Sequence, residues 1–571
     1  MKNCLFSISI LLILISCSQK DTNQTFDKYK NTFVENLWKI SPDWASSQGY
    51  HKYDAVLIIP NIEFRESQMS FIKQNLDSLK KYPINNLNVN NKTDFFMIKN
   101  QLESMDFYIN EYKSYQWNPS EYNVCGAFSE ILNGSYDSLD NRLKNFNLKM
   151  SNIPAFYEAA KVNIKNPTLE HTQLSIDQNL GGLSVFQTDL VNELAKSKLS
   201  EPEKQDILQN AKKSEMAILD FTDWLKKLDN TTPKSFRLGT DLYDKKFNFD
   251  IQSGYSSDGI YQKAVLHKTE LHDKMFELSE NLWTKYMGNA TKPMDRLVQI
   301  KQVIDKISLQ HTTPENFQSE IQKQIPELTA YVKAKNLLYI DPSKPLVVRK
   351  EPDYMAGVAG ASISAPGPYD KNANTYYNVG SMSGWDKARS ESYLREYNDY
   401  ILQILNIHEA IPGHYTQLVY SNQSPSIIKS IFGNGAMIEG WAVYSEKMML
   451  ESGYNTTDEM MLMYYKWNLR STCNTILDIS VHTKDMTKEQ ALNLLINEAF
   501  QQQAEADGKW KRVSLTQVQL CSYFAGYTEI YEFRESLKKE DKDFDLKKFH
   551  EKFLSYGSAP VKYIKELYTK K

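Results

Sequence analysis

The chain contains few cysteines and has almost no net charge. Only five of its 571 residues are cysteine, and those expected in the mature protein are scattered, so neither a disulfide framework nor a cysteine zinc site is indicated. The formal net charge of −3 gives no electrostatic signal for nucleic acid or for an anionic membrane surface. The sequence has no fixed-period repeat and no sustained heptad. A composition of 41% hydrophobic and 24% charged residues is typical of a soluble globular protein with a large core.

The N-terminus has the features of an export signal rather than of a folded segment. Lys2 supplies positive charge, and the apolar run from Leu5 to Ile15 is too short to span a membrane as a mature helix. The quartet Leu14-Ile15-Ser16-Cys17 resembles a bacterial lipobox, which implies lipidation of Cys17; a plain secretory signal is the alternative. We therefore expect a signal peptide over residues 1–17, a polar tether over 18–25, and a lipid-anchored periplasmic or outer-membrane lipoprotein of the bacterial cell envelope.

Most of the chain between residues 26 and 338 has the periodicity of amphipathic helices. Apolar residues recur at i, i+3 and i+4, with proline, glycine or asparagine between the segments. The clearest predicted helices are Ser138 to Ile164, Glu203 to Leu228, His267 to Met287, Pro293 to Gln310 and Phe317 to Leu338. Gly181-Gly182 interrupts another such run and predicts a kink. The fold class is therefore mainly α.

The stretch Ile407-His408-Glu409-Ala410-Ile411-Pro412-Gly413-His414 has the residues that zinc hydrolysis needs. It continues a predicted helix over Ser392 to Asn406, and His408 extends the apolar face of that helix. Two neutral imidazoles, from His408 and His414, can hold the metal, and Glu409 can take a proton from the water that the metal activates.

The spacing of the two histidines is unusual. In the common motif they are four residues apart, about 400° around a helix, whereas here they are six apart, about 600°. Pro412 removes a backbone donor and Gly413 accepts unusual dihedral angles, so a local bulge there can return His414 to the metal. A kinked core helix without metal is the alternative.

A second predicted helix carries two carboxylates on an otherwise apolar face. Glu439 and Glu446 are seven residues apart, hence on one face and about 10.5 Å apart along the axis. Burying carboxylates without partners is costly, and a metal or a metal-bound histidine would be a partner. Both can hardly ligate one zinc ion directly. Buried salt bridges to Arg or Lys are the alternative.

These two stretches resemble the HEAxPGH and EGWA signatures of the bacterial family called domain of unknown function 885. That family is similar to the helical zinc metallopeptidases of the angiotensin-converting-enzyme and oligopeptidase type, and the resemblance runs from about residue 26 to the C-terminus. It implies that His408, His414 and Glu439 are zinc ligands and that Glu409 is the general base. Glu446 is then expected to hold the ring N–H of a ligand histidine.

The resemblance also implies a two-lobed zincin-like metallopeptidase fold, in which a helical lobe of residues 26–338 covers a catalytic lobe of residues 339–571. A small β-sheet is expected next to the active-site helix, because Leu346-Val347-Val348 and Thr375–Val379 have the pattern of short strands in a region rich in proline and glycine. Such a strand can hold a peptide by backbone pairing along a sheet edge. Tyr376, Tyr377 and Asn378 are therefore expected to bind substrate, and a plain structural hairpin is the alternative.

Two later helices are predicted, over Thr487 to Ala506, with Thr487 and Gln490 as a capping box, and over Ser514 to Leu537. Gln519 and Tyr523 resemble the family's late Gly-Gln-x-x-Ser-Tyr pattern, with Arg512 just before it. This implies that Tyr523 hydrogen-bonds the oxyanion and that Arg512 binds substrate. Val518 and Gln517 stand where the family has glycine and proline, and a core-packing role for Tyr523 is the alternative.

Together these features predict an envelope-anchored zinc peptidase that acts on peptides and not on nucleic acid. A helical surface lipoprotein that binds peptide or glycan for uptake fits the lipobox and the aromatic residues equally well. This alternative does not explain why Glu409 lies between the two histidines or why a helix carries paired carboxylates on an apolar face. A zinc amidase acting on cell-wall peptides would use the same residues.

Overall fold

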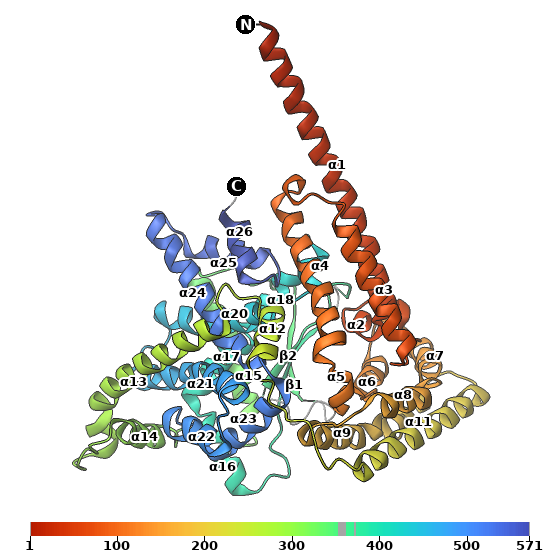
Figure 1. Ribbon diagram of the computed structural model, residues 1–571. Coiled ribbons are helices and arrows are strands. Elements are labelled where there is room, and N and C mark those ends of the chain that lie inside the picture. Colours follow the sequence, from red (N-terminus) through yellow and green to blue (C-terminus); the bar gives the residue numbers. More distant parts are fainter. Residues whose placement is uncertain (1, 352–360, 371–372, 570–571) are drawn as a thin grey trace.

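The computed structural model describes residues 2–351, 361–370 and 373–569, with side chains from residue 21 onward. Helix α1 (Lys2–Ile40) projects from the body at its N-terminal end (Figure 1) and includes the segment 18–25 that was expected as a tether. The side chain of Cys17 lies outside the described residues. Within the part of the chain that the structure describes, no helix combines the length and apolarity needed to cross a membrane.

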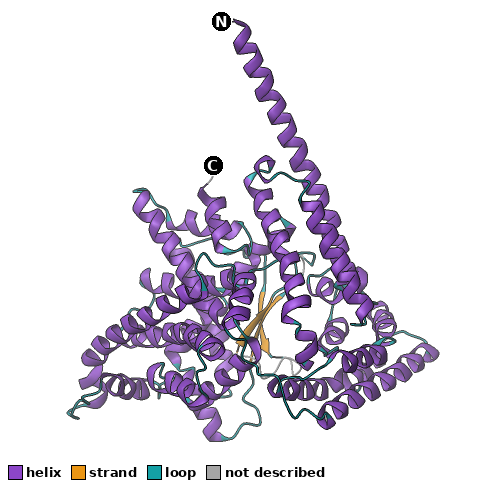
Figure 2. Ribbon diagram, in the orientation of Figure 1, coloured by secondary structure: helices purple, strands orange, loops and turns teal. Residues whose placement is uncertain are grey.

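The described chain is mainly helical with one small sheet (Figure 2). The helices before the sheet are α2 (Pro42–Ser47), α3 (Ile62–Leu79), α4 (Val89–Phe107), α5 (Ser114–Trp117), α6 (Cys125–Asn133), α7 (Leu139–Met150), α8 (Ile153–Asn163), α9 (Leu169–Gly181), α10 (Thr188–Lys196), α11 (Glu201–Lys227), α12 (Thr240–Asp250), α13 (Ser257–Met287), α14 (Arg296–Ile307) and α15 (Phe317–Ala334). The strands are β1 (Leu346–Lys350), β2 (Ala361–Ser364) and β3 (Thr375–Val379). The helices after it are α16 (Lys387–Glu396), α17 (Asp399–Glu409), α18 (His414–Asn422), α19 (Ile427–Ile431), α20 (Gly435–Glu451), α21 (Asp458–Thr483), α22 (Lys488–Asn493), α23 (Gln503–Thr516), α24 (Ser522–Glu540), α25 (Leu546–Ser555) and α26 (Val561–Thr569).

Several predicted helices are present, but their ends differ where a local residue stops or caps a helix. The segment Ser138 to Ile164 is two helices, α7 and α8, because Pro154 lacks a backbone N–H and fits only in the first turn of α8. Helix α13 begins ten residues before the predicted start, where the Ser256 side chain accepts the Gly259 N–H. Helix α9 ends at Gly181, where the kink was expected. The Thr487–Gln490 capping box is present at the start of α22, but a break separates α22 from α23.

Two large hydrophobic cores divide the chain in a way that the sequence did not indicate. One core is built by residues between Tyr122 and Leu225, with Leu57, on helices α6 to α11. The other combines residues from Phe26 to Leu102 with residues from Tyr243 to Ile564. The expected boundary between residues 338 and 339 therefore does not separate the cores, because the larger core contains residues from both sides of it.

The sheet has β3 at its centre. β3 pairs in parallel with β1 and antiparallel with β2, so the two predicted strands do not form a hairpin with each other. The sheet lies next to α17, since the Tyr377 hydroxyl donates to Asn406 Oδ1 at 2.9 Å. A small sheet beside the histidine-bearing helix is therefore present, with β2 as a strand that the sequence analysis missed.

Helices α20 and α24 cross with their backbones in contact. A Cβ atom on Gly526 would lie 1.7 Å from the carbonyl oxygen of Ala436, and one on Gly440 would lie 2.3 Å from the carbonyl carbon of Gly526. Backbone atoms at such distances cannot be displaced by a rotamer change. The glycine of the EGWA stretch is thus required by this helix crossing.

Gly526→Ala is expected to lower the melting temperature, because the added methyl group forces the two helices apart at a cost of about 1–3 kcal/mol or more. Gly508→Ala is the matched control, since Gly508 lies within α23 and a Cβ atom there would meet nothing within 4 Å. That control is expected to be neutral or to stabilise the protein by up to about 1 kcal/mol. Thermal unfolding of both variants measures the difference, and equal melting temperatures would contradict the steric explanation.

Candidate metal centre

His408 and His414 lie at the ends of two successive helices. The predicted helix from Ser392 is broken at Asn398, whose side chain accepts the first N–H groups of α17. Helix α17 then ends at Glu409 and α18 begins at His414, so the expected bulge within one helix is wrong. The intervening turn contains a cis Ile411–Pro412 bond.

Gly413 allows this turn to close on the preceding helix. A Cβ atom on Gly413 would lie 1.8 Å from the carbonyl oxygen of His408, so no side chain fits there. The two imidazole rings consequently approach each other, with centroids 4.8 Å apart and planes at 88°. The two helix ends thus bring the imidazole rings together, which the six-residue spacing does not allow within one unbroken helix.

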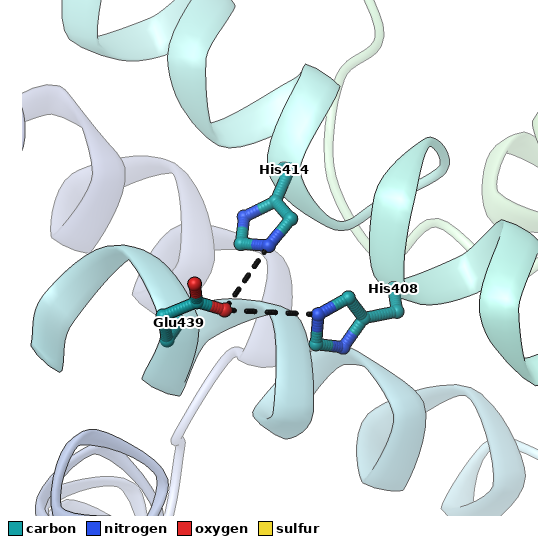
Figure 3. Close-up of side chains that lie close together, drawn as sticks. All are labelled: His408, His414 and Glu439. Atoms are coloured by element: carbon teal, nitrogen blue, oxygen red, sulfur yellow. Dashed lines mark ion pairs between the residues drawn. The ribbon is translucent and has the colours of Figure 1, made fainter. Parts of the chain in front are cut away.

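Glu439, from the second turn of α20, completes a partly buried cluster with the two histidines (Figure 3). Its Oε2 atom lies 3.3 Å from His414 Nε2 and 3.8 Å from His408 Nε2. Possible ligand atoms of the three residues all lie within 4.8 Å of one another. In the described ranges no other group of three or more His, Cys, Asp or Glu side chains converges in this way.

The cluster fits a zinc ion by its donor set and by its unsatisfied oxygen. Glu439 Oε2 is buried and has no hydrogen-bond partner, although it faces two imidazole nitrogens. A buried carboxylate oxygen without a partner is costly, and a cation among these three atoms would remove that cost. Two imidazoles and one carboxylate are a common ligand set for catalytic zinc.

Glu446 lies behind His408, on the side away from Glu439. His408 Nδ1 and Trp467 Nε1 lie 2.7 Å and 2.9 Å from Glu446 Oε1. A ring N–H donated to Glu446 leaves the His408 Nε2 lone pair facing the cluster. No Arg or Lys side chain of the described residues pairs with either Glu439 or Glu446, so the alternative of two buried salt bridges is wrong.

Burial and mutual charge shift the pKa of each group in the cluster. Burial and the nearby His414 lower the pKa of His408 to about 4. Burial opposes the charged forms of His414 and Glu439, but their mutual attraction outweighs it, so the pKa of His414 is raised and that of Glu439 is lowered. Burial holds the pKa of Glu446 well above its usual range. The site thus favours neutral His408 and ionised Glu439, as metal binding requires, whereas a metal ion would have to displace the proton that the raised pKa of His414 favours.

Glu409 is the last residue of α17 and is buried next to the cluster. Burial raises the pKa of Glu409, and the two histidines oppose the rise. Its carboxylate makes no hydrogen bond with the described residues. A carboxylate that is unengaged and has a raised pKa is suited to accept a proton.

Tyr523 lies in the first turn of α24, with its ring 6.5 Å from the His408 ring and nearly parallel to it. Arg512 Nη2 donates to the Tyr523 hydroxyl at 3.0 Å and to Gln519 Oε1 at 2.8 Å. Burial and Glu439 raise the pKa of Tyr523 to about 12, so its hydroxyl is protonated at neutral pH. The structure therefore brings Gln519, Arg512 and Tyr523 together beside the cluster.

The predicted helix from Ser514 to Leu537 is wrong at its start, because a turn separates α23 from α24. Val518 has a left-handed backbone with φ 72°, the conformation that glycine favours at this position of the family pattern. Asp478 Oδ1 accepts the Val518 N–H at 2.9 Å and Oδ2 accepts the Leu520 N–H at 3.2 Å. Asp478 thus holds the turn that positions Tyr523. Sequence reasoning missed it, although a carboxylate within the apolar run Thr475–Val481 is a usable signal.

The side chains of β3 form hydrogen bonds with residues other than those of the cluster. Tyr377 bonds Asn406, and Asn378 bonds Arg349 and Ser364. The Arg349 guanidinium covers the ring of Tyr376 at 3.9 Å. The backbone of β3 is paired on both sides, so the expectation that this strand pairs with a substrate is wrong.

A cavity of about 460 Å³ lies beside the cluster rather than over it. Its lining includes Gln519, which is bonded to Arg512, and Gly435, the first residue of the helix that carries Glu439. His408, His414 and Glu439 do not line it. The cavity therefore adjoins the site on the side of Arg512.

Comparison with known proteins gives a family and two similar structures. A putative lipoprotein of unknown function from Shewanella oneidensis is 52% identical, covers 95% of this chain and 100% of its own, and superposes with a TM-score of 0.86. A putative lipoprotein from Colwellia psychrerythraea is 16% identical, with 95% and 98% coverage and a TM-score of 0.77, which shows the same fold. No curated protein matches the chain. The model of the family described as "Bacterial protein of unknown function (DUF885)" matches residues 42–567, which confirms the family expected from the two signatures. The chain belongs to the DUF885 family.

Proposed function

We propose that the protein is a zinc-dependent peptidase with a zincin-like active site. The observation that carries this proposal is the convergence of His408, His414 and Glu439, with Glu446 on the far ring nitrogen of His408. A lipoprotein that only binds peptide or glycan needs neither this ligand set nor a free carboxylate beside it. Both features are what hydrolysis requires.

The residues around the cluster supply the other parts of the reaction. A bound zinc ion supplies Lewis-acid chemistry, because it polarises a carbonyl group and acidifies water. Glu409 accepts a proton from the attacking water and passes it to the leaving amine. Arg512 occupies a lone pair of the Tyr523 hydroxyl oxygen, which leaves the hydroxyl proton for the oxyanion that forms on the scissile carbonyl.

The test is metal analysis combined with digestion of a peptide library. The purified mature chain is expected to bind about one zinc ion, since one cluster of ligands is present in the described residues. It is also expected to cleave peptides, and removal of zinc by a chelator should stop cleavage until zinc is restored. A chain that folds equally well and ignores added zinc would overturn the proposal. Cleavage confined to cell-wall peptides would instead favour the amidase.

We further propose that Cys17 anchors the chain to the envelope, in line with the two similar proteins that are described as putative lipoproteins. Cys17→Ala is expected to leave the protein soluble or unprocessed, because acyl chains supply the membrane affinity. Detergent partitioning of cell extracts measures this. Cys125→Ala is the control, since Cys125 is a buried free cysteine far along the chain. Equal partitioning of the two variants with the detergent phase would contradict lipidation of Cys17.

A further inference from the structure

Three cationic side chains lie near one another and near the candidate metal cluster, and the Glu505 carboxylate lies within ion-pair distance of two of them. Arg470 comes from α21, and Lys509 and Arg512 come from α23. Glu505 pairs with Arg470 through Nη2, and it lies 4.0 Å from Lys509 Nζ. Arg512 has no carboxylate partner among the described residues and bonds only the neutral groups of Gln519 and Tyr523. Positive charge is therefore in excess here.

Of the neighbouring carboxylates, Glu439 attracts Lys509 and Arg512 but belongs to the candidate metal cluster. Lys466 and Glu396 form their own buried pair at 2.9 Å. Lys509 is the least satisfied of the cations, since its side chain is only 5% exposed and its ammonium group makes no hydrogen bond with the described residues. Burial, and repulsion from Arg470, hold the pKa of Lys509 well below its usual range. Lys509 thus has only a distant carboxylate and no hydrogen-bond acceptor among the described residues, and a carboxylate of a bound molecule would supply an acceptor that stabilises its charged form.

The three cations also adjoin the groups that would act on a substrate. Arg512 holds the Tyr523 hydroxyl at 3.0 Å. The Arg470 guanidinium lies 4.7 Å from the centre of the Trp467 ring, and Trp467 donates to Glu446 behind His408. An anionic group bound among these cations would therefore lie close to the residues that the proposed reaction uses.

We propose that Arg470, Lys509 and Arg512 bind a carboxylate group of the peptide substrate. The inference rests on the proposed peptidase function, because it assigns a substrate class to the same site. Two groups of a peptide have this chemistry, namely the C-terminal carboxylate and an acidic side chain. Arginine and lysine pairs with a carboxylate are charge-assisted and strong where water is excluded.

The experiment measures binding separately from turnover, in the zinc-loaded full mature chain with Glu409→Gln. Calorimetry compares three peptides of one sequence: with a free C-terminus, with a C-terminal amide, and with a C-terminal amide plus one added acidic residue. Amidation is expected to weaken binding by about 10–100-fold, as for the loss of a charged hydrogen-bonded partner. A loss on amidation that the acidic residue does not restore would identify the C-terminus as the source of the carboxylate, and a gain from the acidic residue without any effect of amidation would identify the side chain.

Lys509→Met in the same background is expected to remove most of this preference without lowering the melting temperature, because methionine replaces an unsatisfied buried charge. Lys511→Met is the matched control, since Lys511 is exposed on the same helix. Equal binding of all three peptides, or a preference that survives Lys509→Met, would overturn the inference.

The inference and the peptidase proposal fail in different ways. A wild-type chain that cleaves all three peptides with equal kcat/KM is a peptidase that does not recognise a carboxylate. A chain that binds peptides in a carboxylate-dependent way but cleaves none would support the cationic site and overturn the peptidase proposal. A Lys509→Met variant that loses stability but keeps its peptide preference would give Lys509 a structural role only.

Discussion

Glu409→Gln is expected to reduce peptide hydrolysis by about 10²–10⁴-fold, the usual contribution of a general base. The amide keeps the size of the carboxylate but cannot accept the proton. Zinc content is expected to stay at the wild-type level, because the three converging ligands are other residues, His408, His414 and Glu439. The measurements are kcat/KM on a cleaved library peptide and elemental analysis of the same preparation.

Glu540→Gln is the matched control for this variant. Glu540 is exposed at the end of α24, so the same change of charge is made away from the site. It should leave both activity and zinc content unchanged. Turnover of Glu409→Gln within a few-fold of the wild type would assign the base to another residue or favour the binding lipoprotein.

Glu439→Gln is expected to weaken zinc binding more than Glu446→Gln does. Glu439 Oε2 faces both Nε2 atoms, whereas Glu446 contacts only the far nitrogen of His408. Loss of a partner that orients a ligand typically costs about 10–100-fold in metal affinity. Loss of a direct ligand should exceed that range, since one of three protein donors is removed.

A competition titration with a chromogenic chelator measures both affinities on one scale. Thermal unfolding with and without zinc gives a second readout, because a ligand of the folded state stabilises it in proportion to its affinity. The wild type should gain most from zinc, Glu446→Gln less and Glu439→Gln least. The opposite order of the two variants would reverse the assignment of ligand and orienting residue.

The cluster of two histidines and a glutamate could be predicted from the sequence because its members stand in two short motifs. His408, His414 and Glu439 converge as expected, and Glu446 reaches His408. The path of the backbone between the histidines could not be predicted. Hydrophobic periodicity reports which face of a helix is buried but not where the helix ends. Here a helix end replaces the expected bulge, and only a close approach of Gly413 to His408 makes it possible.

The strand and the late turn show a second limit of sequence reasoning. Pairing partners of a short strand depend on distant segments, and β2, which fills one edge of β3, has little strand signal of its own. In the same way, Asp478 fixes the turn before Tyr523 from a helix about 40 residues away in the sequence. The local pattern can mark Asp478 as an unusual carboxylate in an apolar run, but it does not say which segment that carboxylate contacts. Tyr523 was therefore found through family resemblance, and its support by Asp478 was missed.

The contact between Gly440 and Gly526 has a consequence for sequence divergence. Glu439 precedes one glycine and Tyr523 lies on the helix of the other, so the separation of ligand and tyrosine is determined by main-chain atoms. No side chain lies between the two helices where these glycines meet, so side-chain size does not set the helix separation at that point. Relatives can therefore exchange core residues extensively while the distance between these two groups stays constant, provided that both positions remain glycine.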